Sequence, residues 1–164
     1  MEPSTRTETL TRVLAIDLGE RRMGLALSDP LHITAQGLPT AERRNKREDM
    51  NFIKSLAKKH DAALIVLGHP INMDGTRGAS AERAERFAAA LEKHLGLRVE
   101  LWDERLTSVE ANHLMRDAGL DHSQRGRNVD QMAATLLLQN YLESERMKAD
   151  MQDGGEHEEE DGSR

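Results

Sequence analysis

Acidic residues at three places in this chain have the types and surroundings needed for joint chemistry. Asp17 interrupts the apolar run L-A-I-D-L, Asp103 and Glu104 end the run L-R-V-E-L-W, and Asp130 precedes A-A-T-L-L. Converging carboxylates repel one another unless a cation joins them. Hard divalent cations such as Mg²⁺ and Mn²⁺ prefer oxygen ligands, and two of them roughly 4 Å apart can activate water in phosphodiester hydrolysis. The residues predict a metal site if the fold brings them together.

Each of these carboxylates also has an ordinary interpretation when it is taken alone. Asp17 could form an ion pair with Arg21 or Arg105, and a carboxylate at a strand end is usually solvated. An aspartate in the first turn of a helix, as predicted for Asp130, normally interacts favourably with the helix dipole. The case for a shared site therefore depends on the elements that carry them.

Hydrophobic patterning predicts those elements. A tight connection, G-E-R-R at 19–22, joins the first two apolar runs, which favours an antiparallel hairpin. The predicted strands cover residues 12–18, 23–28, 33–38, 62–67 and 97–102. The predicted helices cover residues 48–59, 80–95 (closed by Gly96), 107–119 (begun by the capping box T-S-V-E) and 129–143. Residues 72–78 and 121–127 are predicted to be loops.

This order predicts the fold class α/β, with a mixed sheet and helices packed on its faces. The spacing of Ala133, Ala134 and Leu137 behind Asp130 puts this aspartate on the sheet-facing side of the last helix. We expect one domain at residues 10–146. Residues 147–164 form an acidic tail with little apolar content, which predicts disorder.

Composition narrows the function classes. Residues 150–164 hold seven acidic and one basic side chain, which equals the whole net charge of −6, whereas residues 10–149 hold 20 acidic and 21 basic groups. The body is therefore nearly neutral, which leaves a nucleic-acid partner open. The chain has no cysteine, which excludes disulfides and thiolate metal sites. It has no apolar run of membrane-spanning length, so we expect no membrane partner and a cytoplasmic location.

Four ordered motifs resemble one known family. They are D-L-G-E-R-R-M-G-L-A-L-S-D at 17–29, G-H-P-I-N-M-D-G-T at 68–76, W-D-E-R-L-T-S at 102–108 and V-D-Q-M-A-A at 129–134. In order and spacing they resemble the YqgF/RuvX family, whose members are described as Holliday junction resolvase-like and as candidate pre-16S rRNA nucleases. The likeness runs from about Arg12 to Leu142. One departure is His69, where the family more often has an apolar residue.

The resemblance implies an RNase H-like fold, a mixed five-stranded sheet with three antiparallel strands first. It also implies a nuclease that depends on Mg²⁺ or Mn²⁺, with Asp17, Asp130 and one carboxylate of W-D-E-R as its catalytic and metal-binding residues. Strand alternation favours Glu104 over Asp103, because Glu104 shares a face with Glu100 and Trp102. That argument is weak at a strand end, so both residues stay open as metal ligands.

Several polar side chains are candidates for binding the substrate. Arginine suits phosphate through its two-pronged donor group, and functional loops lie at the ends of parallel strands. Each candidate could equally be a solvated surface residue, and Arg105 could instead pair with Asp103. The candidate substrate-binding residues are Arg21, Arg22, Asn72, Arg105, Arg125 and Arg127.

The favoured hypothesis is a metal-dependent hydrolase that cuts structured nucleic acid, with processing of the 5′ end of pre-16S rRNA in ribosome biogenesis as its function. Nothing in the sequence separates RNA from branched DNA, so a Holliday junction resolvase is the nearest alternative. A catalytically silent RNA-binding assembly factor is another alternative. D-L-G after a first strand also opens the actin and sugar-kinase fold, but such enzymes normally need two domains. The sequence leaves a homodimer open.

Overall fold

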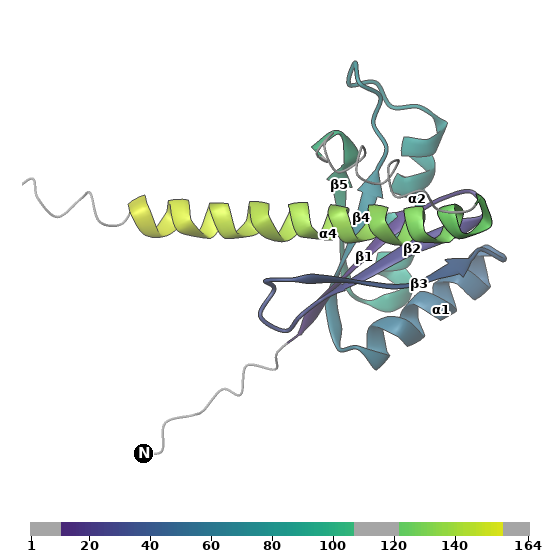
Figure 1. Cartoon of the computed structure of the whole chain (residues 1–164), viewed down its shortest axis with the longest axis horizontal. Coiled ribbons are helices and arrows are strands. Elements are labelled where there is room, and N and C mark those ends of the chain that lie inside the picture. Colours follow the sequence, from purple (N-terminus) through teal and green to yellow (C-terminus); the bar gives the residue numbers. More distant parts are fainter. Residues whose placement is uncertain (1–10, 107–121, 156–164) are drawn as a thin grey trace, which may run out of the picture.

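A mixed five-stranded sheet forms the centre of the protein (Figure 1). The computed structural model describes residues 11–106 and 122–155. The strand order is β3-β2-β1-β4-β5, with β1–β2 and β2–β3 antiparallel and β4 and β5 parallel to β1. The predicted sheet, with three antiparallel strands first, is confirmed. The strands are β1 (Arg12–Leu18), β2 (Arg22–Ser28), β3 (Ala35–Glu42), β4 (Ala62–His69) and β5 (Arg98–Asp103).

Helices cover both faces of this sheet. Helices α1 (Lys46–Lys59) and α2 (Ala79–Leu95) pack on one face, and α4 (His122–Gly155) packs on the other. A short 3₁₀ helix, η1 (Glu104–Leu106), follows β5. The chain leaves α2 through Gly96, whose φ of 67° is the left-handed conformation that glycine adopts easily. The helices predicted at 48–59 and 80–95 are confirmed within two residues at each end.

Alternation along β1 decides which face each residue joins. Leu14 and Ile16 are buried against α1 and α2, whereas Val13 and Ala15 are buried against α4. Because side chains alternate along a strand, Asp17 belongs to the α4 face. Trp102 of β5 packs with the same cluster, and Val99 packs on the opposite side. The α4 face therefore holds the parts of β1 and β5 that end in candidate carboxylates.

The third strand begins later than predicted, at Ala35 instead of Ile33. Asp29 accepts backbone N–H bonds from Leu31 (3.1 Å), Ile33 (2.7 Å) and Thr34 (2.7 Å), and these bonds fix the preceding segment as a turn. The strand then runs through Pro39 to Glu42. Proline is tolerated because β3 is an edge strand, where a missing N–H removes no ladder bond.

The last helix is longer than predicted at both ends. It begins at His122, so the predicted loop at 121–127 is wrong from that residue on. This segment contains Gly126, but one glycine costs a helix only about 1 kcal/mol. At the other end α4 continues past Glu143 and past the predicted boundary at Met147 to Gly155. Met147, Lys148 and Ala149 have high helix propensity, so this exposed part does not need a core partner.

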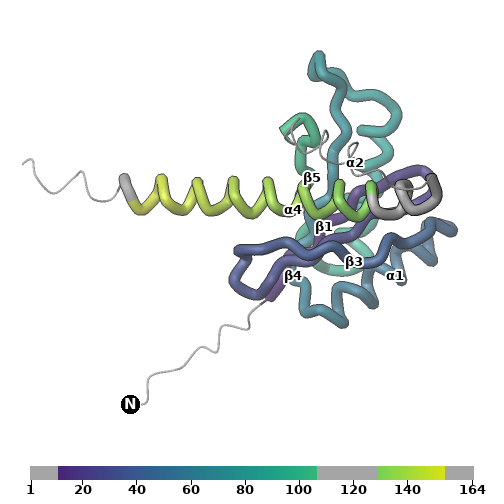
Figure 2. The backbone as a smooth tube through the Cα atoms, viewed as in Figure 1, coloured from purple at the N-terminus to yellow at the C-terminus, as the bar shows by residue number. Residues whose placement is uncertain are grey.

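Figure 2 shows α4 crossing the strands and then extending beyond the sheet. The helix predicted at 107–119 lies outside the described residues, as does the tail from residue 156 on. Within the described part of the chain, no helix combines the length and apolar character needed to cross a bilayer.

Candidate active site

Asp17 lies between two glycines of the neighbouring strands. Gly24 pairs with Asp17 across the β1–β2 ladder, and Gly68 follows Leu67, which pairs with Ile16. A side chain at Gly24 would collide with the backbone carbonyl of Asp130 on α4, and one at Gly68 would collide with the carboxylate of Glu104.

These close approaches show where the other two acidic residues lie. Glu104 lies over Gly68 on one side of Asp17, and the backbone of Asp130 lies over Gly24 on the other side. Glu104 and Asp130 are 87 and 113 positions from Asp17 in the sequence. The fold brings both to the same edge of the sheet as Asp17, next to α4.

Asp17 and Glu104 are hydrogen-bonded and shift each other's pKa. Burial raises the pKa of Asp17, and the negative charge of Asp130 raises it further. The hydrogen bond from Glu104 acts in the opposite direction, but the pKa stays above its ordinary value. Burial, the charge of Asp17 and the hydrogen bond to Asp17 together raise the pKa of Glu104 to about 7. Glu104 is therefore the donor of this bond and Asp17 the acceptor. Two carboxyl groups this close cannot both ionise easily.

Arg22 holds the third carboxylate. Its Nε atom lies 3.2 Å from Oδ2 of Asp130, and both side chains are about one-third exposed, at 37% and 29%. Burial raises the pKa of Asp130, and the charge of Arg22 opposes that rise. Arg22 comes from the start of β2, so the β1–β2 turn brings a cation directly to the carboxylates.

Asp103 is placed differently from Glu104. It lies opposite His69 in the β4–β5 ladder. Arg105 donates to both of its oxygens at 2.8–3.1 Å, and the bonds from Arg105 lower the pKa of Asp103. Asp103 is thus an ionised, paired side chain, while Glu104 faces Asp17. This is the arrangement expected from strand alternation, which grouped Glu104 with Trp102 on the α4 face.

The other candidates for substrate binding are spread around this edge. Arg21 is exposed in the β1–β2 turn. Arg105 is engaged with Asp103, the alternative that the sequence left open. Asn72 donates to Oγ1 of Thr76 at 3.0 Å, within the loop that follows β4. The backbone of residues 125 and 127 lies in α4, and their side chains are outside the described part.

Sequence reasoning missed the roles of Gly24 and Gly68. Both lie inside apolar strands, where glycine lowers stability and commonly marks the close approach of another group. Each is two residues from a buried residue of the α4 face, Ala26 and Val66, so alternation alone puts them on that face. Two such glycines, with an aspartate on the strand between them, were the available signal.

The chemistry of the donor set fits a hard divalent cation. Asp17 and Glu104 offer carboxylate oxygens, and neither has a cationic partner among the described residues. When both are ionised they repel one another, and a bound cation would relieve that repulsion. The third carboxylate is turned to Arg22. Accordingly, among the described residues no group of three possible ligands is already arranged to hold one ion.

The sheet order and the acidic edge define a class of fold, that of the RuvC-like RNase H proteins. The structure of Thermus thermophilus RuvC in complex with a Holliday junction substrate matches 84% of this chain and 96% of that chain, with a TM-score of 0.55 and 13% identity. A second Thermus thermophilus RuvC structure gives a TM-score of 0.51 at 14% identity, over 84% and 97% of the two chains. At such identities the likeness establishes the fold.

Sequence comparison then identifies the family. The family model described as "RuvX: Holliday junction resolvase" matches residues 11–144. A protein of Koribacter versatilis named "Putative pre-16S rRNA nuclease" is 48% identical over 132 residues, which cover 80% of this chain and 86% of that protein. A protein of Clostridium beijerinckii with the same name is 46% identical, over 80% and 96% of the two chains. The chain belongs to the RuvX family, and the resemblance seen in the sequence is confirmed.

Proposed function

We propose that the protein is a metal-dependent nuclease that hydrolyses phosphodiester bonds in structured RNA and processes the 5′ end of pre-16S rRNA in the cytoplasm. The observation that carries the proposal is the carboxyl pair Asp17–Glu104, with Asp130 beside it, at the edge of a RuvC-like sheet. The names of the relatives favour rRNA as the substrate.

The chain's own residues suggest how the site works. Asp17, Glu104 and Asp130 would hold Mg²⁺ or Mn²⁺, which supplies Lewis-acid activation and a water that ionises easily. The proton that Glu104 shares with Asp17 must leave before both side chains can act as ligands. Arg22 must release Asp130, and its freed guanidinium is then available to a phosphate oxygen.

The test is a cleavage assay on two substrates side by side, precursor 16S rRNA and a four-way DNA junction, with Mg²⁺ or Mn²⁺ and with chelator. Cleavage of the RNA alone supports the proposal, and cleavage of the junction alone supports a Holliday junction resolvase, the activity in the family description. Binding of RNA without metal-dependent cleavage would identify a silent assembly factor and refute the nuclease assignment.

The matched variants are Asp17→Asn and Asp150→Asn. Both replace one carboxylate by an amide, but Asp150 is exposed in the extended part of α4. We expect Asp17→Asn to remove metal-dependent cleavage while its circular dichroism spectrum stays that of the parent, and Asp150→Asn to cleave normally. Undiminished cleavage by Asp17→Asn would refute the site.

A further inference from the structure

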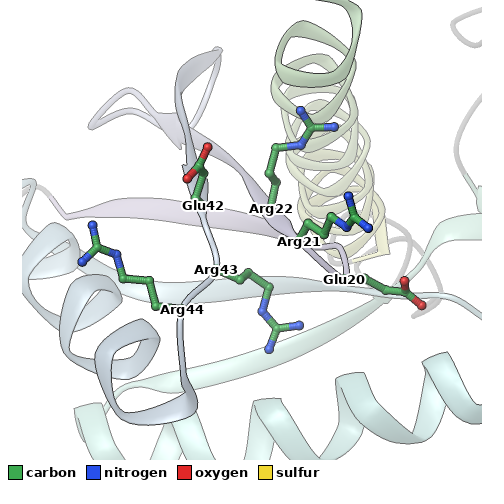
Figure 3. A pocket seen from close by; sticks show the side chains of 6 residues that line it. All are labelled: Glu20, Arg21, Arg22, Glu42, Arg43 and Arg44. Atoms are coloured by element: carbon green, nitrogen blue, oxygen red, sulfur yellow. The ribbon is translucent and has the colours of Figure 1, made fainter. Parts of the chain in front are cut away.

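A cleft whose described lining residues are all charged lies beside the candidate active site. It separates the β1–β2 turn from the segment that joins β3 to α1, and it has a volume of about 640 Å³. Four of the six lining residues are arginines, and Figure 3 shows them around the cleft. We call it the arginine cleft, lined by Glu20, Arg21, Arg22, Glu42, Arg43 and Arg44.

Arg43 builds the wall of the cleft. Its backbone N–H donates to the carbonyl of Arg21 at 2.8 Å, and its Nη1 donates to the carbonyl of Gly19 at 3.0 Å. Its guanidinium also reaches Asp49 at 3.4 Å and lies 5.8 Å from the ring centroid of Phe87. These bonds fix the β1–β2 turn against the start of α1, so Arg43 has a structural role and the cleft is preformed.

Arg21 and Arg44 are different. Both are exposed, and neither side chain has a hydrogen bond or ion pair with another described residue. The backbone beneath Arg44 is nevertheless fixed, because its N–H donates to the buried Asp49 at 3.0 Å. In Figure 3 the two guanidinium groups lie apart, with Arg43 between their backbones. Two separated cations suit a chain of phosphates better than a single anion.

The sequence around Arg44 reinforces this reading. Residues 43–47 read R-R-N-K-R, four cations in five positions, in a body that is close to neutral. Lys46 and Arg47 begin α1, where positive charge opposes the helix dipole. Residues that break a local rule of this kind are expected at functional sites.

Arg22 connects the arginine cleft to the carboxylates. It lines the cleft and also contacts Asp130 at 3.2 Å. Of the two acidic residues in the cleft, Glu20 lies 4.0 Å from Arg83 of α2, whose positive charge partly offsets that of the carboxylate. A polyanion that extends from the carboxylate edge into the cleft would therefore meet Arg22 at the edge, and Arg21 and Arg44 farther along the cleft.

We propose that the arginine cleft binds the sugar-phosphate backbone of the nucleic acid on one side of the cut, with Arg21 and Arg44 each contacting a phosphate. The inference rests on the proposed function and names the part of the protein that holds the flanking strand. Arg44 and the start of α1 are outside the set of residues that the sequence motifs indicated.

The first test is binding of a structured RNA, followed by fluorescence anisotropy in chelator over a series of salt concentrations. Arg44→Gln should weaken binding several-fold at low salt and reduce the slope of log K against log salt by about 1, as expected for one lost phosphate contact. The matched control is Lys58→Gln, which removes one charge at the end of α1 that is far from Arg44 and should leave the slope unchanged.

The second test locates the nucleic acid without relying on affinity. Because the chain has no cysteine, Arg44→Cys and Lys58→Cys each create a single attachment point for an iron–EDTA probe. Hydroxyl radicals from position 44 should cut the bound RNA backbone close to the nuclease cleavage position, and those from position 58 should not.

The results separate the two proposals. An unchanged salt slope for Arg44→Gln, together with no radical cleavage from position 44, would overturn the arginine cleft while metal-dependent cleavage by the parent protein still supported the nuclease. If the parent protein neither binds nor cuts nucleic acid, both proposals fail.

Discussion

Replacing Glu104 by glutamine should stabilise the protein at alkaline pH while it removes activity. The pKa of Glu104 is about 7 in the folded protein, against an ordinary value of 4.5. The folded state therefore holds the proton more tightly than the unfolded state between these values. This contribution to stability is fully present below pH 4.5 and is lost as the pH rises through 7. Glutamine imitates the protonated form at every pH.

The magnitude follows from the size of the shift. One pKa unit corresponds to about 1.4 kcal/mol, so linkage gives a loss of about 2.5 kcal/mol between pH 5 and pH 8 for the parent. Partial exposure and screening reduce this figure, and we expect about 1–2 kcal/mol. The variant should match the parent at pH 5 and exceed it at pH 8, by roughly 2–4 °C in Tm per kcal/mol.

The assay is urea and thermal unfolding of parent and Glu104→Gln in chelator at several pH values from 5 to 8. The rest of the chain is the same in both proteins, so the difference between them reports on the Asp17–Glu104 pair. Glu143→Gln, an exposed position on α4, is the control and should show no pH-dependent difference. Adding Mg²⁺ at pH 8 should stabilise the parent more than Glu104→Gln, because a ligand raises the free energy of unfolding more when it binds the folded state more tightly. A stability difference that does not change with pH would refute the shared proton.

Two further predictions test the surroundings of the site. Asp103→Asn should keep metal-dependent cleavage, with its half-saturating Mg²⁺ concentration within about twofold of the parent, because Asp103 is paired with Arg105. Glu104→Gln should instead remove metal-dependent cleavage. Equal effects of the two substitutions would contradict the separation of these neighbours. Gly24→Ala should lower the free energy of unfolding by about 1–3 kcal/mol and displace α4, because the added methyl meets the carbonyl of Asp130. Gly78→Ala, where the nearest atom would lie at 3.6 Å, is the control, and an equal loss in both variants would refute the close approach.

The sheet was predictable because its signals are local. Apolar runs bounded by turn residues indicated each strand, and alternation in β5 grouped Glu104 with Trp102 before any contact was known. Asp130 followed from the spacing of Ala134 and Leu137, both of which are buried in the structure. The roles of these carboxylates in catalysis stay predictions until the variants are made.

The remaining features depend on contacts that sequence spacing does not reveal. The start of β3 depends on three backbone bonds to Asp29. Helix α4 begins before Gly126 and continues through it. The ion pair of Arg22 with Asp130 forms only because α4 packs against β2. The arginine cleft joins residues 20–22 to residues 42–44, which become neighbours only through the β2–β3 ladder.

The edge that carries Asp17 is arranged against stability in several independent ways. Two glycines interrupt buried strands, two carboxyl groups share one proton, and a third carboxylate is partly buried with Arg22 as its partner. Apolar residues of similar volume at these positions would remove the desolvation cost and the repulsion. The glycines also let Glu104 and α4 come close to Asp17. Packing of the core does not require this close approach, because alanine packs well elsewhere in the sheet. Together these features support the metal site that we propose, because a divalent cation needs negative charge concentrated at one point and a packed core does not.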